Sequence, residues 1–200
     1  MENIKLVKTA KGLDTFVNVV GTIFKVIGII CAIFAILVLI LGDKMYDASS
    51  LTLELDFIIL NLADGIQMPE FHMNAYAVAG LIANCFTCFL LSYIAVILRR
   101  ILSPMKEGRP FEADIPANLR KIAWLSLIVG IIEQVAGIAE RVLLTFTYPM
   151  DDIFSSELIS SWESNFTVDF SFVIVFLVIM FLSYIFTYGQ KLQQESDETL

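Results

Sequence analysis

Four long apolar runs with very few charges dominate the 200-residue chain. They cover about residues 16–41, 75–98, 122–144 and 168–188. Because a helix rises about 1.5 Å per residue, each run has the roughly 20 residues needed to cross a hydrocarbon layer about 30 Å thick. The pattern predicts an all-α membrane protein, a single domain in which four transmembrane helices form one bundle with the lipid bilayer around it.

A pattern of period two lies between the first two apolar runs. Over residues 51–60, leucine, phenylalanine and isoleucine alternate with Thr52, Glu54 and Asp56, as in a half-buried β-strand. Asp64-Gly65 follows as a turn signal. We therefore expect a small β-hairpin in the loops that follow the first and third apolar runs. It forms either within the loop between the first two runs or by pairing of that loop with residues 165–170.

Composition and charge indicate on which side of the membrane each loop lies. The chain is 58% hydrophobic and 17% charged, against about 45–50% and 25% in soluble domains. Loops 42–74 and 145–167 are acidic, whereas lysine and arginine gather before residue 16, in loop 99–121 and after residue 188. The positive-inside rule then predicts that both termini and loop 99–121 are cytoplasmic, with loops 42–74 and 145–167 on the outer side.

One acidic residue lies deep inside an apolar run. Glu133 is about 18 Å along the helix from Lys121, near the expected midplane, where a charge costs about 2.5–3.5 kcal/mol. We expect it to face the interior, with Asn84, Gln134 or Lys25 as partner. Three roles stay open: Glu133 joins the helices, handles a proton or cation, or is a neutral glutamate with no special role.

Small residues recur at intervals of three or four in two of the runs. Polar residues share both stripes with them: one stripe is Gly21, Lys25, Gly28, Ala32 and Ala35, and the other is Ser126, Gly130, Glu133, Gly137 and Arg141. Because small side chains let membrane helices approach closely, both stripes predict helix-packing faces.

The loop between the second and third runs and the tail carry candidate partner-binding residues. Ser103-Pro104 is expected to end the helix, because the residue before a proline disfavours helical geometry. A tight turn follows, and Asp114 is a suitable N-cap for the next helix. The tail can form a helix that presents Leu192 and acidic side chains. The candidates are Gly108, Pro110, Phe111, Leu192, Glu195 and Asp197.

Two segments resemble an uncharacterised bacterial membrane family, the domain-of-unknown-function family 2975. They are Gly108-x-Pro110-Phe111 with Asn118-Leu119-Arg120-Lys121-Ile122, and Tyr188-Gly189-x-x-Leu192-Gln193-x-Glu195-x-Asp197-Glu198-Thr199-Leu200. The resemblance covers the four-span layout and is sharpest over residues 98–122 and 184–200. It implies a bacterial inner membrane and, because such proteins are often encoded beside a small helix-turn-helix regulator, a membrane partner for that regulator. It supplies no catalytic residues.

The residues favour a regulatory role over catalysis. No nucleophile has a visible base, and the three cysteines and His72 do not make a metal site, so we predict no enzyme, no cofactor and no metal. The leading hypothesis is a regulatory or sensory membrane partner of a cytoplasmic protein, without direct nucleic-acid binding. The alternative is a small transporter, channel or immunity-type protein that uses Glu133. A homo-oligomer is compatible with either.

Overall fold

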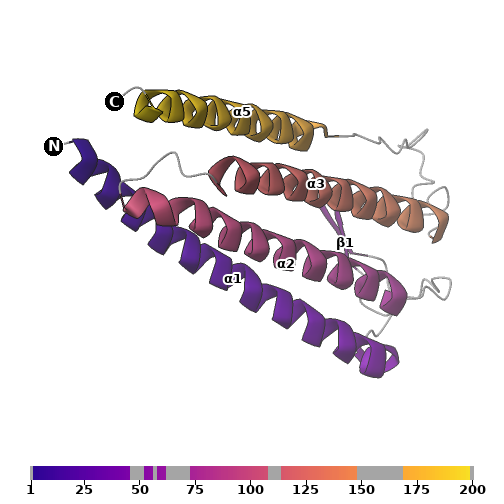
Figure 1. The fold of residues 1–200 in the computed structure, drawn as a ribbon. Helices are drawn as coiled ribbons and strands as arrows, with labels where there is room; N and C mark the ends of the chain where they lie inside the picture. Colours follow the sequence, from indigo (N-terminus) through magenta and orange to yellow (C-terminus); the bar gives the residue numbers. More distant parts are fainter. Residues whose placement is uncertain are drawn as a thin grey trace.

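The computed structural model describes residues 2–45, 52–55, 58–61, 73–107, 114–147 and 169–198. Within these residues lie four helices, α1 (Glu2–Met45), α2 (Met73–Lys106), α3 (Asp114–Thr147) and α5 (Ser171–Glu198) (Figure 1). Each contains a stretch that is long and apolar enough to cross a bilayer. The prediction of four long apolar helices is confirmed, and the chain has the make-up of a multi-pass membrane protein.

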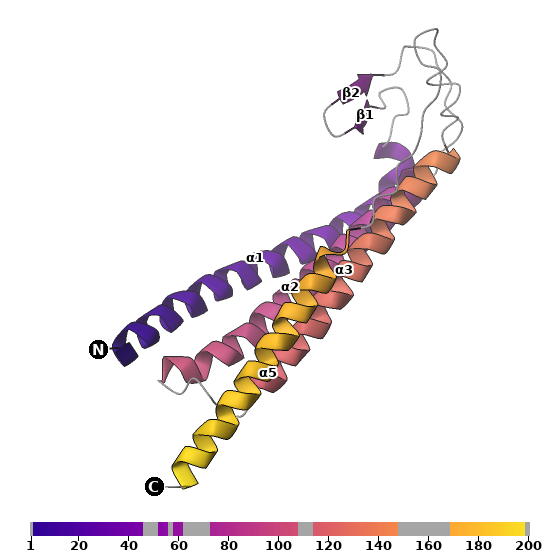
Figure 2. The same ribbon diagram turned by 90° about the horizontal axis from the view of Figure 1, so that it is seen from above.

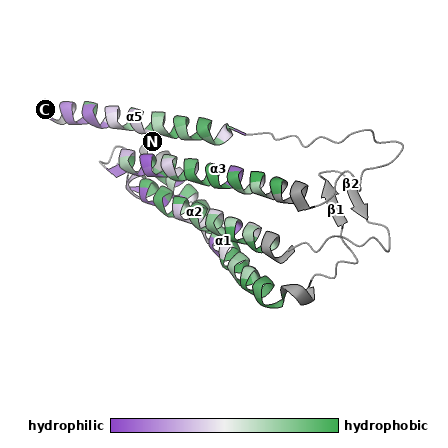
Figure 3. Cartoon of the chain, turned by 90° about the vertical axis from the view of Figure 1, so that its right-hand side faces the viewer, coloured by the Kyte–Doolittle hydropathy of each residue, from purple (hydrophilic) through white to green (hydrophobic). Residues whose placement is uncertain are grey.

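The helices form an open row. Among the described residues, α1 packs on α2, α2 on α3 and α3 on α5, so that α1 and α5 lie at the two edges (Figures 1 and 3). The expected single bundle is therefore not closed. Elements that follow one another in sequence usually lie side by side, and these helices do so. Lipid tails are as apolar as the side chains, so no hydrophobic force drives the edges together.

The contact between α1 and α2 uses the first small-residue stripe. A Cβ built on Gly21 would lie 2.7 Å from the Cβ of Ala95, and one built on Gly28 would lie 3.3 Å from the Cβ of Cys88. Ala35, two turns farther along α1, is 6% exposed. These three positions recur every seven residues, and small side chains there let the two backbones approach closely.

The buried core lies where α2 ends and α3 begins. Ile97 and Ile101 of α2 pack with Ile115 and Ile122 of α3, and Ile97 and Ile115 are each 1% exposed. Elsewhere large apolar side chains cover the surface, and Ile40 is 72% exposed. A surface of this kind is suited to lipid (Figure 3).

The end of α2 differs from the prediction. Helix α2 continues through Pro104 to Lys106, and the Glu107 amide donates to the Pro104 carbonyl over 3.0 Å. Proline removes one hydrogen bond from a helix. Burial of Ile101 and Leu102, which are 4% and 7% exposed, helps to hold the last turn in helical form. Helix α3 begins at Asp114, as expected.

The strand-like segment folds back on itself. Strands β1 (Thr52–Leu55) and β2 (Ile58–Asn61) are antiparallel, with Thr52 opposite Asn61 and Leu55 opposite Ile58 (Figure 2). The sheet lies at the end of the row away from the two termini. The other strand considered was residues 165–170. Residues 165–168 lie outside the described residues, and Asp169 and Phe170 belong to no strand.

Candidate functional site

Positive charge gathers at one end of the row. Here α2 ends, α3 begins and both termini lie, and the helices are hydrophilic (Figures 2 and 3). We call it the basic end. It is defined by Lys8, Lys11, Arg99, Arg100, Lys106, Arg120, Lys121 and Lys191. The charges lie just beyond the apolar stretches, at the depth of lipid headgroups.

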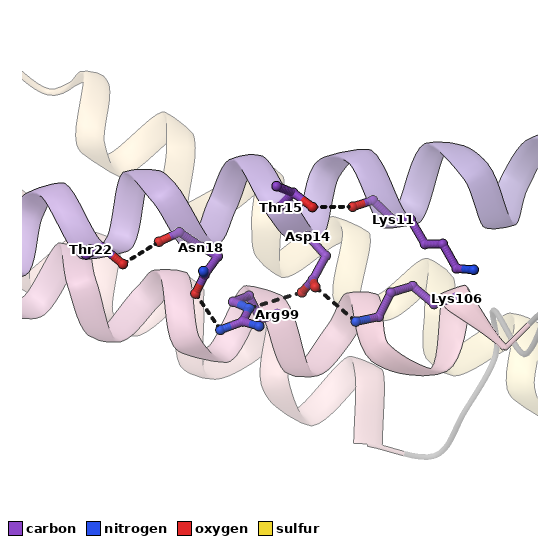
Figure 4. Close-up of polar contacts among 7 residues, drawn as sticks. All are labelled: Lys11, Asp14, Thr15, Asn18, Thr22, Arg99 and Lys106. Atoms are coloured by element: carbon purple, nitrogen blue, oxygen red, sulfur yellow. Dashed lines mark hydrogen bonds and ion pairs between the residues drawn. The ribbon is translucent and has the colours of Figure 1, made fainter.

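Asp14 of α1 forms ion pairs with two of these cations. Its Oδ1 accepts a hydrogen bond from Arg99 Nε over 3.1 Å, and its Oδ2 accepts one from Lys106 Nζ over 3.0 Å (Figure 4). Arg99 also donates from Nη1 to Asn18 Oδ1 over 2.6 Å. The Asp14 side chain is 16% exposed and that of Arg99 is 44% exposed, so this network joins α1 to α2 at a partly water-accessible position.

Sequence reasoning missed Asp14, although a signal was present. It is the only acidic residue between Asn3 and Leu41. Asn18 lies four residues later and therefore on the same helical face. An isolated carboxylate at the edge of an apolar run needs a cationic partner, and the cations that follow residue 98 were the nearest candidates.

A pocket of about 400 Å³ separates the end of α2 from the start of α3. The polar residues that line it are Arg100, Ser103, Glu107, Asp114, Asn118 and Lys121. Arg100 and Lys121 are exposed and form no ion pair with any described residue. Asn118 is only 9% exposed, and its side chain makes no hydrogen bond within the described segments. The pocket thus combines two cations, two carboxylates and a buried amide.

Helix α5 packs on the first half of α3. Ser183, which is 2% exposed, donates its hydroxyl to the Pro116 carbonyl over 2.9 Å. Farther along, the rings of Trp124 and Phe176 have centroids 5.1 Å apart, and Phe172 lies against Gly130. Since Pro116 belongs to the first turn of α3, the last three turns of α5 extend beyond the start of α3 (Figure 2).

The extension of α5 carries the predicted tail residues. Leu192 is 49% exposed, and Glu195 and Glu198 are exposed on the same helix. Asp197 belongs to α5, but its side chain lies outside the described part. Gly108, Pro110 and Phe111 also lie outside the described residues. The tail is therefore helical, with a large apolar side chain between charged groups.

Glu133 does not face the interior as predicted. Its side chain is exposed and forms no ion pair within the described segments. The reason is the position of α5, which begins at Ser171 beside Gly130 and so does not cover the rest of α3. Two turns past Gly130, a Cβ built on Gly137 would have no atom within 4 Å. The second small-residue stripe is a packing face only as far as α5 extends.

The proposed partners of Glu133 are also placed elsewhere. Asn84 is exposed and donates to the Gly80 carbonyl of its own helix over 3.1 Å. Lys25 is exposed on α1, which does not pack on α3, and Gln134 is half-buried. The structure does not bring these four residues together.

The family was identified by comparison with known proteins. A model described as Protein of unknown function (DUF2975) matches residues 61–200. The chain belongs to this family. No curated protein and no solved structure matches it. The matched region contains the pocket, the α3–α5 contact and the tail helix, whereas Asp14 lies before it.

The family description names no activity, so the chemistry of the site has to be inferred from its residues. Among the described residues, no three histidine, cysteine, aspartate or glutamate side chains are grouped as metal ligands. Cys31 and Cys85 are free and half-buried, and Cys88 is free and buried against Gly28. The polar groups of the basic end are suited to binding charged groups.

Proposed function

We propose that this protein is a regulatory membrane protein whose basic end faces the cytoplasm and binds a cytoplasmic protein there. The observation that carries the proposal is the helical extension of α5, which projects past the start of α3 with Leu192 49% exposed. Leu192 thus offers an apolar side chain among charged neighbours, which a partner could cover. Such a helix is a common binding element for a groove on a partner.

The charge of the extension favours a basic partner. Residues 189–200 contain Glu195, Asp197 and Glu198 and only one cation, Lys191. Surfaces that bind nucleic acid are positively charged, so an acidic helix is complementary to a DNA-binding regulator. The helix-turn-helix regulators encoded near members of the family fit this description. We propose that the extension binds such a regulator and holds it at the membrane.

Orientation is part of the same proposal. Eight cations define the basic end, while the stretches around the β1–β2 hairpin are acidic. By the positive-inside rule the hairpin is on the extracytoplasmic side of the bacterial inner membrane, where it is available to sense an envelope signal. With Cys31, Cys85 and Cys88 replaced by alanine, Glu198→Cys should resist an impermeant maleimide in intact spheroplasts and Glu54→Cys should react. The reverse pattern would overturn the orientation.

Partner binding is tested on the full chain in nanodiscs. The purified regulator encoded beside the gene should bind, and Leu192→Ser or deletion of residues 190–200 should weaken binding at least about 10-fold. Leu13→Ser is the matched control, because Leu13 is 47% exposed at the same end but belongs to α1. If deletion of the tail together with neutralisation of Arg100, Arg120 and Lys121 leaves binding unchanged, the proposal fails.

The alternative, a small transporter or channel, depends on Glu133. It has less support, because Glu133 is exposed on the part of α3 that α5 does not cover. Reconstituted proteoliposomes distinguish the two functions. A proton or cation flux that Glu133→Gln abolishes would favour transport, and a flux that the substitution leaves unchanged would exclude this version of it.

A further inference from the structure

The pocket at the basic end has the properties of a ligand site. Its volume, about 400 Å³, lies within the range of small-molecule sites, roughly 300–1,000 Å³. We propose that it binds the headgroup of a phospholipid that carries both a phosphate and a primary ammonium, the phosphoethanolamine type.

The buried amide of Asn118 points to a polar ligand. Asn118 is 9% exposed and lines the pocket, and no described residue accepts or donates a hydrogen bond to its side chain. Burial of an amide without a hydrogen-bonding partner is unfavourable, so such groups in proteins almost always have one. A phosphate oxygen accepts the hydrogen bond that the amide NH₂ offers.

The two cations of the pocket are available for the same phosphate. Arg100 and Lys121 have no ion-pair partner among the described residues, in contrast to Arg99 and Lys106, which are paired with Asp14. Arg99 and Arg100 are adjacent in sequence, but Arg99 contacts α1 and Arg100 lines the pocket between α2 and α3. A guanidinium and an ammonium beside one pocket are the usual ligands of a phosphate.

The position of the pocket favours a lipid as the source of that phosphate. Arg100 follows the apolar stretch 75–98 of α2 within two residues, and Lys121 immediately precedes the apolar stretch 122–144 of α3. The pocket therefore lies at the depth of the headgroups. Basic pockets between membrane helices are known to bind lipid headgroups at this depth.

The carboxylates of the pocket select a zwitterion. Glu107 and Asp114 also line it, so the two cations are matched by two negative charges. A purely anionic headgroup or a free phosphate ion would be attracted by the two cations and repelled by the two carboxylates. A headgroup with phosphate at one end and ammonium at the other is complementary to both, with the ammonium donating hydrogen bonds to Asp114.

Native mass spectrometry of the detergent-solubilised full chain tests the proposal without any protein partner. The wild type is titrated with phosphatidylethanolamine, phosphatidylglycerol and phosphatidylcholine of the same acyl chains, and separately with inorganic phosphate. We expect phosphatidylethanolamine to bind about 10-fold more tightly than the other two lipids. Its ammonium carries a positive charge and donates hydrogen bonds, whereas the ammonium of phosphatidylcholine has no N–H group and phosphatidylglycerol has no ammonium. Inorganic phosphate should bind weakly.

Variants distinguish the pocket from the general surface. Arg100→Gln with Lys121→Gln should abolish the preference, and Asn118→Leu should weaken phosphatidylethanolamine binding. Asp114→Asn should reduce discrimination against phosphatidylcholine while leaving phosphatidylglycerol binding no weaker. Arg99→Gln, whose cation belongs to the Asp14 network, is the matched control and should bind like the wild type.

Three outcomes would overturn the proposal. They are equal binding of all three lipids by the wild type, a preference that survives the Arg100 and Lys121 double variant, and phosphate binding as tight as lipid binding. Asn118 is buried, so its variant is interpreted only if its melting temperature matches the wild type. The exposed Arg100 and Lys121 positions decide the question in any case.

Discussion

Gly21 of α1 lies so close to Ala95 of α2 that a Cβ built on the glycine would be 2.7 Å from the alanine Cβ. Real Cβ atoms do not approach each other so closely, so any larger residue at position 21 must move one helix. Gly28 repeats the approach two turns later, against the Cβ of Cys88 at 3.3 Å. The contact between α1 and α2 thus depends on glycine at the point of closest approach.

Substitution of Gly21 should therefore destabilise the helix pair. Alanine is a better helix former than glycine by about 1 kcal/mol, which alone would stabilise α1. At position 21 the clash with Ala95 should outweigh this gain, since overpacking costs about 1–3 kcal/mol. Gly21→Ala should lower the melting temperature measured by circular dichroism in one detergent.

The chain provides a matched control for this substitution. A Cβ on Gly12, in the same helix, would have no atom within 4 Å. Gly12→Ala should leave the melting temperature unchanged or raise it. Equal effects of the two substitutions would mean that α1 and α2 do not approach each other at Gly21.

Removal of the Asp14 charge should also weaken the contact between α1 and α2. Asp14→Asn cannot pair with Arg99 and Lys106, and we expect a loss of about 1 kcal/mol of unfolding free energy. The loss should shrink at high salt, because salt screens interactions between charges. Unfolding of the solubilised chain at low and high ionic strength measures both effects.

A double-mutant cycle isolates the ion pair. Asp14→Asn and Lys106→Gln should be less than additive, because either one removes the same 3.0 Å contact. Asp14→Asn combined with Lys121→Gln should be additive, since Lys121 lies in the pocket between α2 and α3. Additivity in both combinations would refute the pairing.

The hydroxyl of Ser183 should contribute to the attachment of α5. It is 2% exposed and donates to the Pro116 carbonyl of α3 over 2.9 Å. Ser183→Ala should cost about 1 kcal/mol, because the carbonyl loses this donor. Thr187→Ala is the matched control, since the Thr187 hydroxyl donates to the Ser183 carbonyl within α5 itself. Proteolysis rates or melting that respond equally to both variants would contradict an interhelical role.

The sequence predicts the helices well but not how they are offset. The length and hydropathy of an apolar run determine whether it can span a membrane, and the small residues at 21 and 28 indicate a packing face. No local pattern reports that Phe172 of α5 lies against Gly130 of α3. Because this offset leaves Glu133 exposed, the environment of Glu133 could not be predicted from the sequence.

The candidate site was predicted only in outline. The basic loop and the acidic tail are visible as charge patterns, and Leu192 is exposed on a helix as expected. The pocket depends on how the end of α2 and the start of α3 are spaced around Asn118. In the sequence alone, Asn118 cannot be told apart from a polar residue in a water-facing turn. Because the sequence predicts that α2 ends at Pro104, Glu107 was not recognised as a residue that lines the pocket.

Glu133 provides the sharpest test of the open row of helices. The Glu133 side chain is exposed in the structure. If this exposed side chain faces lipid, Glu133→Leu removes a polar group from the bilayer and should not lower the melting temperature. Ser126→Leu is the contrasting change, because Ser126 is half-buried on the part of α3 that α5 covers, and added volume there should cost about 1–3 kcal/mol. Both variants are measured in the same lipid nanodiscs. If Glu133→Leu destabilises the chain as much as Ser126→Leu does, Glu133 has a buried partner, and the transport function regains its strongest candidate residue.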